Sequence, residues 1–541
     1  MKKLLLKLKI PLLLIFSGLL SALPLIYPQL GALQWVSMIP MGMALFALAE
    51  GKGKLRLLSA YGLGMIFYTC YYSMVFHWLL YLHPLNFTEI SNEASLAIAM
   101  LGCFGVAFLQ ALFSAVGFVV FVAAARTEFV RRVPYLMPVL MGAIWAVAEW
   151  WQTIGWWGMP WGRIAIGQVS FALLVRSASL FGPYFISFII VAFNLFLALA
   201  IVKKGSKRIA IVAAVSFFAL NLALGTAVTV SYAVTSYYGE NDRTVTVAAA
   251  QGNIPSGHDL DLGNALKLSI YRELTEKAAA EGAEMIVWSE TAIPFEMLSN
   301  EYMTDQVRQI AVENDITILV SAFTKDEESG MRYNSLYVID SNGEIGEEVY
   351  HKQMLAPFGE YVPLRDVFVT IFPPLGDINM LKSDLKAGEE CVVLESEHGK
   401  VGCGICFDSI YENVTLGATN NGAEIIVMST NFSWFRDSRA LNMQNAHCRL
   451  RAIENGKYLV CSANTGISAI IDPLGNVIDE VGVLEPFEND YILSEVEMIE
   501  GETLYSIIGN AFVYICISVP VALLVSEIFV NINKKRRSAF V

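Results

Sequence analysis

Three ionisable residues of different types follow strand-like runs, and together they could carry out acyl transfer through a thioester. Glu290 ends the run EMIVWSE, Lys352 follows EEVYH, and Cys406 ends VGCGIC. A thiol must lose its proton to attack a carbonyl, and a carboxylate whose pKa is raised by burial can take that proton. An ammonium can stabilise the thiolate and then the oxyanion of the tetrahedral intermediate. These residue types indicate cysteine-dependent acyl transfer or hydrolysis.

Each of the three residues also has an ordinary structural explanation. A glutamate at a strand end is commonly a solvated rim residue, a single lysine commonly lies on the surface, and a cysteine in an apolar strand is commonly a small core residue. Cys403 and Cys406 have the C-x-x-C spacing of redox and zinc sites. We expect neither site, because residues at this spacing in a strand point to opposite faces. The chain also has no second Cys or His pair at zinc spacing.

The elements that must position these residues lie between residues 243 and 497. Eight short runs rich in β-branched residues read as strands: 244–251, 284–290, 316–323, 334–340, 401–407, 424–430, 458–464 and 467–472. Stretches with polar and apolar faces at 262–281 and 439–455 read as helices between them. This alternation predicts an α/β domain, whose site is expected at strand ends.

The rest of the chain has the composition of a membrane protein. The chain is 55% hydrophobic and 16% charged, with a mean hydropathy of +0.51, which excludes a purely soluble enzyme, a disordered protein and a basic nucleic-acid binder. Runs long enough to span a bilayer predict eight helices, near 9–28, 30–49, 57–82, 96–125, 135–152, 179–202, 209–230 and 505–530. The Trp- and Gly-rich stretch 153–178 reads as a re-entrant or interfacial piece.

Charge divides the chain into the same parts. Residues 1–230 carry 16 basic and 5 acidic residues, residues 231–503 carry 17 and 44, and residues 504–541 carry 4 and 1. With the N-terminus inside, the inner loops hold 18 Lys and Arg, whereas the short outer loops hold Arg163 and Arg176. We therefore expect a membrane domain at 1–230, an extracytoplasmic domain at 231–503, and a last helix with a basic cytoplasmic tail at 504–541.

Several motifs, in order, resemble those of one family. VWSETAIP, YHKQMLAPFGEYVP and GICFDS resemble the Glu, Lys and Cys motifs of the nitrilase (carbon–nitrogen hydrolase) superfamily, and PFGEYVP is similar to its apolipoprotein N-acyltransferase branch. Further similar segments are AEWWQTIGWWGMPWG at 148–162, QGNIP at 251–255, YNS at 333–335, NFSWF at 431–435, RAIENG at 451–456 and ANTGISAIID at 463–472. The resemblance implies a polytopic α-helical membrane domain with an inserted αββα nitrilase-type domain.

The resemblance also implies roles for individual residues. Glu290 would be the general base, Lys352 the oxyanion and thiolate stabiliser, and Cys406 the nucleophile, with Glu360 as a supporting glutamate. The Phe407 backbone N–H would complete the oxyanion hole, and the pocket would be lined by Phe407, Asp408 and Trp434. A phospholipid, commonly phosphatidylethanolamine, would acylate Cys406, and the α-amine of a diacylglyceryl-cysteine at the start of an apolipoprotein would accept the chain. The implied place is the bacterial cytoplasmic (inner) membrane, with the site on the periplasmic side, and no metal or organic cofactor is implied.

Some positions depart from the family's pattern. The family commonly has a tryptophan shortly after QGNIP, but the segment SGHDLDLG that follows here contains none. The Pro that usually precedes the catalytic Glu is Ser289, and the usual Glu two residues after the nucleophile is Asp408. Two other functions compete with the implied one. One is a membrane-tethered amidase or nitrilase that uses water as its second substrate; the other is a transporter or receptor with a sensory ectodomain. Against the latter, the helices hold very few ionisable residues, and Glu149 among tryptophans suits a structural interfacial role.

Overall fold

The computed structural model describes residues 2–51, 56–85, 91–238, 243–255, 263–371, 384–482, 484 and 488–538. Its residues form two compact units. The first comprises Met1–Leu79, Met100–Val230 and Ile508–Val541, and the second comprises Leu80–Ala99 and Ser231–Ile507. Leu80–Ala99 groups with the second unit, although the sequence predicted these residues to belong to the membrane domain.

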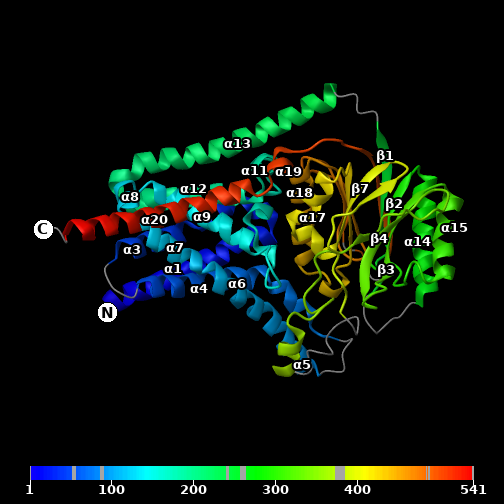
Figure 1. Ribbon diagram of the computed structural model, residues 1–541, viewed down its shortest axis with the longest axis horizontal. Helices are drawn as coiled ribbons and strands as arrows, with labels where there is room; N and C mark the ends of the chain where they lie inside the picture. Colours follow the sequence, from blue (N-terminus) through cyan, green and yellow to red (C-terminus); the bar gives the residue numbers. More distant parts are fainter. Residues whose placement is uncertain are drawn as a thin grey trace. The chain divides into compact units, whose positions relative to one another are not determined.

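The first unit is helical (Figure 1). Its principal helices are α1 (Lys2–Ile26), α3 (Ile39–Glu50), α4 (Arg56–Val75), α6 (Val106–Ser114), α7 (Val116–Ala125), α9 (Leu136–Trp151), α12 (Pro183–Val202) and α20 (Ala511–Ser538). Helix α13 (Lys207–Tyr238) begins in this unit and ends in the second. Shorter pieces are η1 (Pro28–Leu33), α2 (Gln34–Ser37), η2 (His77–Leu82), α5 (Asn92–Met100), η3 (Leu101–Gly105), α8 (Glu128–Arg132), η4 (Pro160–Gly162), η5 (Ile164–Gln168), α10 (Ala172–Val175), α11 (Ala178–Phe181) and η6 (Lys204–Ser206).

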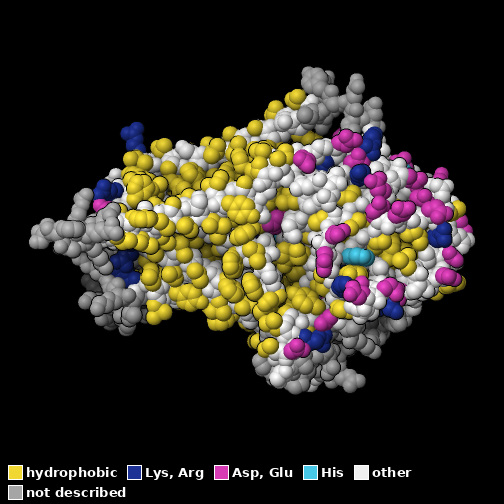
Figure 2. Space-filling view, in the orientation of Figure 1, with side chains coloured by type: hydrophobic (Ala, Val, Ile, Leu, Met, Phe, Trp, Pro, Cys, Tyr) yellow, Lys and Arg dark blue, Asp and Glu magenta, His cyan; other side chains and the backbone are white. Residues whose placement is uncertain are grey.

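Helices occur in all eight predicted ranges, so the predicted polytopic helical domain is confirmed. Among the described residues, six stretches are long and apolar enough to cross a membrane: Lys9–Ile26, Pro28–Glu50, Asn92–Ala125, Pro183–Val202, Lys207–Val234 and Ala511–Ile532. Helix α9 has 16 residues, and α4 is less apolar because it contains Tyr61, Tyr68, Tyr71 and Tyr72. Apolar side chains cover much of this unit in the view of Figure 2. The chain is a multi-pass membrane protein.

Glu149 joins three segments of the membrane unit. Its Oε1 accepts hydrogen bonds from Trp145 Nε1 at 2.8 Å and from the Ile164 backbone N–H at 2.9 Å. Its Oε2 accepts a hydrogen bond from the Ser187 hydroxyl at 2.6 Å. The side chain is buried, and a buried carboxyl group is tolerated when its oxygens are hydrogen-bonded in this way. Glu149 thus ties α9 to the irregular 153–178 stretch and to α12, which is the structural role that its surroundings in the sequence favour.

The second unit is built on two six-stranded sheets. The first has the order β12-β1-β2-β3-β4-β5, and the second has the order β11-β10-β9-β8-β7-β6. The first contains β1 (Thr244–Gln251), β2 (Met285–Val287), β3 (Thr317–Lys325), β4 (Arg332–Ile339), β5 (Tyr350–His351) and β12 (Asp490–Glu497). The second contains β6 (Val393–Ser396), β7 (Gly399–Ile405), β8 (Ile425–Thr430), β9 (Leu459–Ala463), β10 (Ser468–Ile471) and β11 (Val477–Val481). All eight predicted strands are present.

Helices cover the outer faces of both sheets, and the sheets face each other (Figure 1). Helices α14 (Gly263–Ala280) and α15 (Glu301–Asn314) lie over the first sheet, and α17 (Glu412–Asn420) and α18 (Ala440–Asn455) lie over the second. The inner faces are joined by side chains: Ser462 Oγ donates to Ala250 O at 2.8 Å, and Ser429 Oγ donates to Trp288 O at 3.0 Å. The predicted αββα sandwich is confirmed. Two short helices remain. Helix α16 (Arg365–Ile371) lies between β5 and β6 in the sequence, and α19 (Leu504–Ile508) follows β12.

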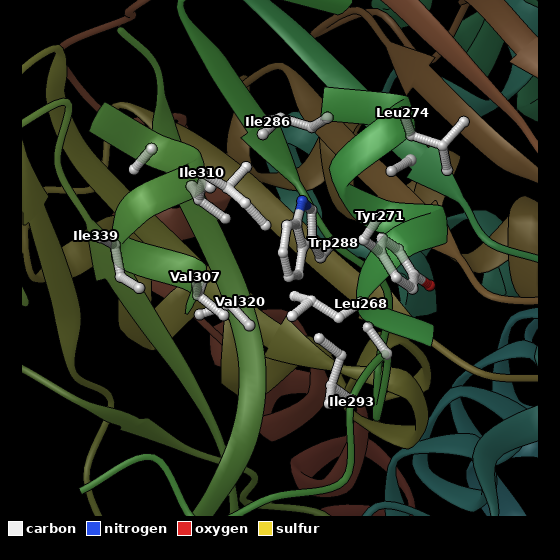
Figure 3. Packing of buried hydrophobic residues seen from close by; sticks show 14 of the residues in the cluster. Leu268, Tyr271, Leu274, Ile286, Trp288, Ile293, Val307, Ile310, Val320 and Ile339 are labelled. Atoms are coloured by element: carbon white, nitrogen blue, oxygen red, sulfur yellow. The ribbon is translucent and has the colours of Figure 1, made fainter. Parts of the chain in front are cut away.

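A large apolar cluster fixes the first sheet to its helices (Figure 3). Trp288, just past β2, is fully buried beside Tyr271 of α14, with ring centroids 5.1 Å apart. Its indole Nε1 donates to Thr275 Oγ1 at 3.1 Å, so its polar atom is satisfied in the core. Because Trp288 precedes Glu290 by two residues, this packing anchors the segment that carries the carboxylate.

Candidate active site

Lys352 lies between two carboxylates. Its ammonium Nζ is 2.9 Å from Glu290 Oε1 and 2.8 Å from Glu360 Oε1. Lys352 directly follows β5, Glu290 follows β2 in the same sheet, and Glu360 lies in the loop after Lys352. The lysine is 1% exposed. A buried ammonium with two charged acceptors is held as a cation in one place.

Burial and charge shift the pKa values of these groups in a definite direction. Burial raises the pKa of Glu290 above its ordinary value, although the neighbouring Lys352 opposes this change. Burial alone would lower the pKa of Lys352, but Glu290 and Glu360 raise it well above its ordinary value. Lys352 is therefore a permanent cation at neutral pH, and Glu290 is a stronger base than an exposed carboxylate.

Cys406 stands at a sharp turn directly after β7. It begins the short helix η9 (Cys406–Ile410) and has a φ of +50°, in the left-handed region that residues with side chains rarely adopt. Such strain is concentrated at functional sites. The expectation that Cys406 lies inside the strand is corrected by this geometry, because β7 ends at Ile405. The direction of the Cys406 side chain is therefore set by the turn and not by the alternating faces of the strand.

The Cys406 thiol interacts with the Glu290 carboxylate, which lowers the pKa of Glu290, and with the backbone N–H of Asn431, which lowers the pKa of the thiol. Burial raises the pKa of this thiol well above its ordinary value, and the nearby Glu290 charge raises it further. Cys406 is thus a protonated thiol at rest, in contact with a carboxylate that can accept its proton. A neutral thiol beside a base, rather than a preformed thiolate, is what this arrangement provides.

Backbone hydrogen bonds hold Lys352 against the sheet and Glu360 within its loop. The Lys352 N–H donates to Asn334 O on β4, and Lys352 O accepts from the Gly388 N–H, both at 2.8 Å. A Cβ on Gly388 would lie 2.4 Å from His351 O, so glycine is required for this close approach. Glu360 Oε2 accepts from the Ala356 N–H at 2.7 Å, which fixes the carboxylate over its own loop.

Asp408 connects the cysteine turn to the lysine strand. Its Oδ2 accepts from Tyr350 Oη at 2.7 Å and from the Ile405 N–H at 2.9 Å, and its Oδ1 accepts from the Met354 N–H at 2.8 Å. Burial raises the pKa of Asp408 to about 6. The side chain is fully buried, so it faces the interior and links Tyr350 and Met354, which flank Lys352, to the residue before Cys406.

Replacing Asp408 with asparagine is expected to slow acylation of Cys406 by about 5- to 150-fold. An amide NH₂ would face an N–H or O–H donor at one of the two oxygen positions, and an unmade buried hydrogen bond costs about 1–3 kcal/mol. The measurement is the single-turnover rate of acyl-enzyme formation by Asp408→Asn beside the exposed control Asp437→Asn. Equal rates for the two variants would contradict this linking role.

Phe407 and Trp434 are the remaining residues to which the sequence assigned a place in the site. Phe407 follows Cys406 in η9 and is buried, with its ring centroid 6.0 Å from that of Tyr411. Trp434 lies half-buried in η10 (Ser433–Phe435), three residues after Asn431. The departure from the family within SGHDLDLG falls on 256–262, outside the described residues. All eight cysteines are free thiols, and the described part of the chain has no group of three or more His, Cys, Asp or Glu that could hold a metal ion.

Two residues at the site received no role from the sequence. Asn334 lies within β4 and donates from Nδ2 to Glu290 Oε1 at 2.8 Å. Asn431 follows β8, and its Nδ2 donates to Thr291 Oγ1 at 3.2 Å. Asn334 belongs to the segment YNS and Asn431 to the segment NFSWF, both of which resemble the family's motifs. Their positions in the sequence do not indicate that either residue lies next to Glu290 or Cys406.

Two family models match the chain, one after the other. Residues 17–196 match the apolipoprotein N-acyltransferase N-terminal domain, and residues 246–498 match the carbon-nitrogen hydrolase family. The second match contains all the residues of the site described above and both sheets, apart from the first two residues of β1. The membrane unit and the αββα unit therefore each resemble a known domain.

Curated relatives resemble the chain over nearly its whole length. An apolipoprotein N-acyltransferase of Geobacter metallireducens is 28% identical over 511 residues, which cover 93% of this chain and 92% of the relative. One of Gloeobacter violaceus is 28% identical over 486 residues, which cover 89% and 87%. Among solved structures, the C. elegans NitFhit protein is 21% identical and aligns with a TM-score of 0.38, covering 47% of this chain and 61% of that one.

Proposed function

Because this chain joins an apolipoprotein N-acyltransferase N-terminal domain to a carbon–nitrogen hydrolase domain, we propose that it acylates the N-terminus of lipoproteins through a thioester on Cys406. The observation that carries the proposal is the interaction of the buried Cys406 thiol with Glu290, whose carboxylate is paired at 2.9 Å with Lys352. The base and the cation are in direct contact, and both interact electrostatically with the nucleophile.

In the first step, Cys406 Sγ attacks the ester carbonyl of a phospholipid, commonly phosphatidylethanolamine, while its proton passes to Glu290. Lys352 stabilises the oxyanion of the tetrahedral intermediate, together with the Phe407 backbone N–H. The ester C–O bond then breaks, Glu290 returns the proton to the leaving alkoxide, and a lysophospholipid departs. Glu360 keeps the ammonium in place through its 2.8 Å contact. Phe407 and Trp434 contribute to the walls of the pocket.

In the second step, the α-amine of a diacylglyceryl-cysteine attacks the thioester. The amine loses its proton to Glu290, the C–S bond breaks, and the thiol is restored by that proton. The product is an amide, so the lipoprotein gains a third acyl chain. Both substrates are membrane lipids, and transfer within the membrane avoids exposing an acyl chain to water, which would cost about 0.8 kcal/mol per CH₂.

The charge distribution supports a periplasmic position for the site. The basic residues beside the membrane helices lie in alternate loops, and under the positive-inside rule this supports a position of residues 231–503 outside the cytoplasm. The chain would then lie in the bacterial cytoplasmic (inner) membrane, where newly exported lipoproteins and phospholipids meet.

The test is to incubate the full chain in detergent micelles with phosphatidylethanolamine carrying a labelled acyl chain and a synthetic diacylated lipopeptide. Mass spectrometry should show the lipopeptide heavier by one labelled chain on its α-amine, and no gain for an N-acetylated control peptide. In sealed spheroplasts, externally added lipopeptide should be converted without permeabilisation. Release of labelled fatty acid without amide product would instead indicate the competing hydrolase, and conversion that requires permeabilisation would reverse the orientation.

A further inference from the structure

Asn334 contacts both carboxylates of the site through its side chain and the backbone of Lys352 through its main chain. It lies in β4, is 2% exposed, and donates from Nδ2 to Glu290 Oε1 at 2.8 Å and to Glu360 Oε1 at 3.5 Å. Its backbone oxygen accepts the Lys352 N–H at 2.8 Å. The side-chain amide thus reaches both carboxylates, and the backbone carbonyl of the same residue holds the backbone of Lys352.

A second layer of hydrogen bonds fixes the direction of this amide. Ser321 Oγ on β3 donates to Asn334 Oδ1 at 3.4 Å, which directs the NH₂ group toward the carboxylates. The same Ser321 oxygen accepts the backbone N–H of Thr291 at 3.2 Å, next to Glu290. Neighbouring residues of β4 serve other contacts: the Tyr337 hydroxyl hydrogen-bonds Thr324 Oγ1 at 2.5 Å. Asn334 is therefore directed at the site by its surroundings.

We propose that Asn334 is a positioning residue that keeps Glu290 ionised and aimed at the Cys406 thiol. The Asn334 amide and the Lys352 ammonium both bond Oε1 of Glu290, which leaves Oε2 for the thiol. An N–H donor to a carboxylate favours the charged form, and the charged form is the one that can accept the thiol proton. This inference rests on the proposed function only in giving Glu290 the role of base toward Cys406.

The charged and titratable groups around Glu290 are few and come from three segments. Lys352 and Glu360 approach from β5 and its following loop, and Cys406 approaches from η9. Asp408 also interacts electrostatically with Lys352. His351 belongs to another cluster, where its ring stacks on Tyr333 at 4.1 Å and its Nδ1 hydrogen-bonds Ser335 Oγ at 2.8 Å.

The test follows alkylation of Cys406 by iodoacetamide as a function of pH in the purified full chain, with the labelled peptide quantified by mass spectrometry. This reaction needs the thiol and its base but no lipid. In the unmodified chain the rate should fall at acid pH as Glu290 is protonated, and Glu290→Gln should lose this acid limb. For Asn334→Ala the midpoint of the limb should move up by about one pH unit, and for Asn334→Asp, which adds a negative charge, by more.

The matched control is Tyr337→Phe, a buried change on the same strand away from the carboxylates, which should leave the midpoint unmoved. If the Asn334 variants do not accumulate, Ser321→Ala should give a smaller shift of the same sign. A uniform loss of rate without movement of the midpoint, or no change, would overturn the proposal. Acyl transfer can fail while these shifts appear, in which case the proposed function falls and the positioning role stands.

Discussion

Cys406→Ala is expected to abolish acyl transfer, lowering the turnover rate by roughly 10⁴-fold or more, because no thioester can form. Among the described residues, Cys406 is the cysteine that contacts the Glu290 carboxylate, and it does so from a turn with a φ of +50°. The measurement is labelled lipopeptide formed per enzyme in micelles. The protein should still insert in membranes, since removal of one buried thiol leaves the membrane helices unchanged.

Cys403→Ala is the matched control for this result. Cys403 is buried in β7, three residues earlier, and its Sγ approaches Val401 O at 3.8 Å rather than the charged cluster. We expect its turnover to stay within about twofold of the unmodified chain, because removing one sulfur from a packed strand is a modest volume change. Activity that survives Cys406→Ala, or that is lost through Cys403→Ala instead, would contradict the assignment of the nucleophile.

Glu290→Gln is expected to reduce the rate of thioester formation by about 10²–10⁴-fold, the usual contribution of a general base. The amide keeps the size of the side chain but cannot accept the thiol proton. Because burial raises the pKa of the carboxyl, the rate of the unmodified chain should fall as the pH drops through this raised pKa and Glu290 becomes protonated. Single-turnover acylation at several pH values measures both effects.

Glu360→Gln is the comparison for the base. Glu360 pairs with Lys352 at 2.8 Å, so its change removes support for the ammonium and leaves the Glu290 carboxylate in place. We expect a loss of about tenfold, as for one hydrogen bond to a charged group. Equal losses in the two variants, or an acyl-enzyme that accumulates normally in Glu290→Gln and fails only in transfer, would show that Glu290 is not the base in thioester formation.

Much of the architecture could be predicted because its signals are local. The eight apolar stretches and the eight predicted strands are present, since a long apolar run or a β-branched run carries its own signature. The strands β5, β6, β11 and β12 were not expected. β5 has two residues, and β11 alternates half-buried and exposed positions, so their pairing depends on neighbours that a local pattern does not contain.

The site was predictable in its residue types and less so in its contacts. Glu290 and Lys352 meet because β2 and β5 run in the same direction and their last residues lie at the same end of the sheet. Glu360 joins them from the loop that follows Lys352. Asp408 illustrates the limit: resemblance placed it in the pocket wall, and the structure turns its carboxylate toward Tyr350 and two backbone N–H groups. Asn334 shows the same limit. Its role depends on hydrogen bonds to Glu290 and Glu360, which lie far from it in the sequence, so no local pattern could indicate it.

The most direct test of the central claim is mass spectrometry of the purified full chain after incubation with labelled phosphatidylethanolamine and no acceptor. We expect one labelled acyl chain on the peptide that contains Cys406, removable by hydroxylamine as a thioester and absent from Cys406→Ala. An adduct on Cys403 or another cysteine, or no adduct while lipopeptide is still acylated, would contradict the mechanism.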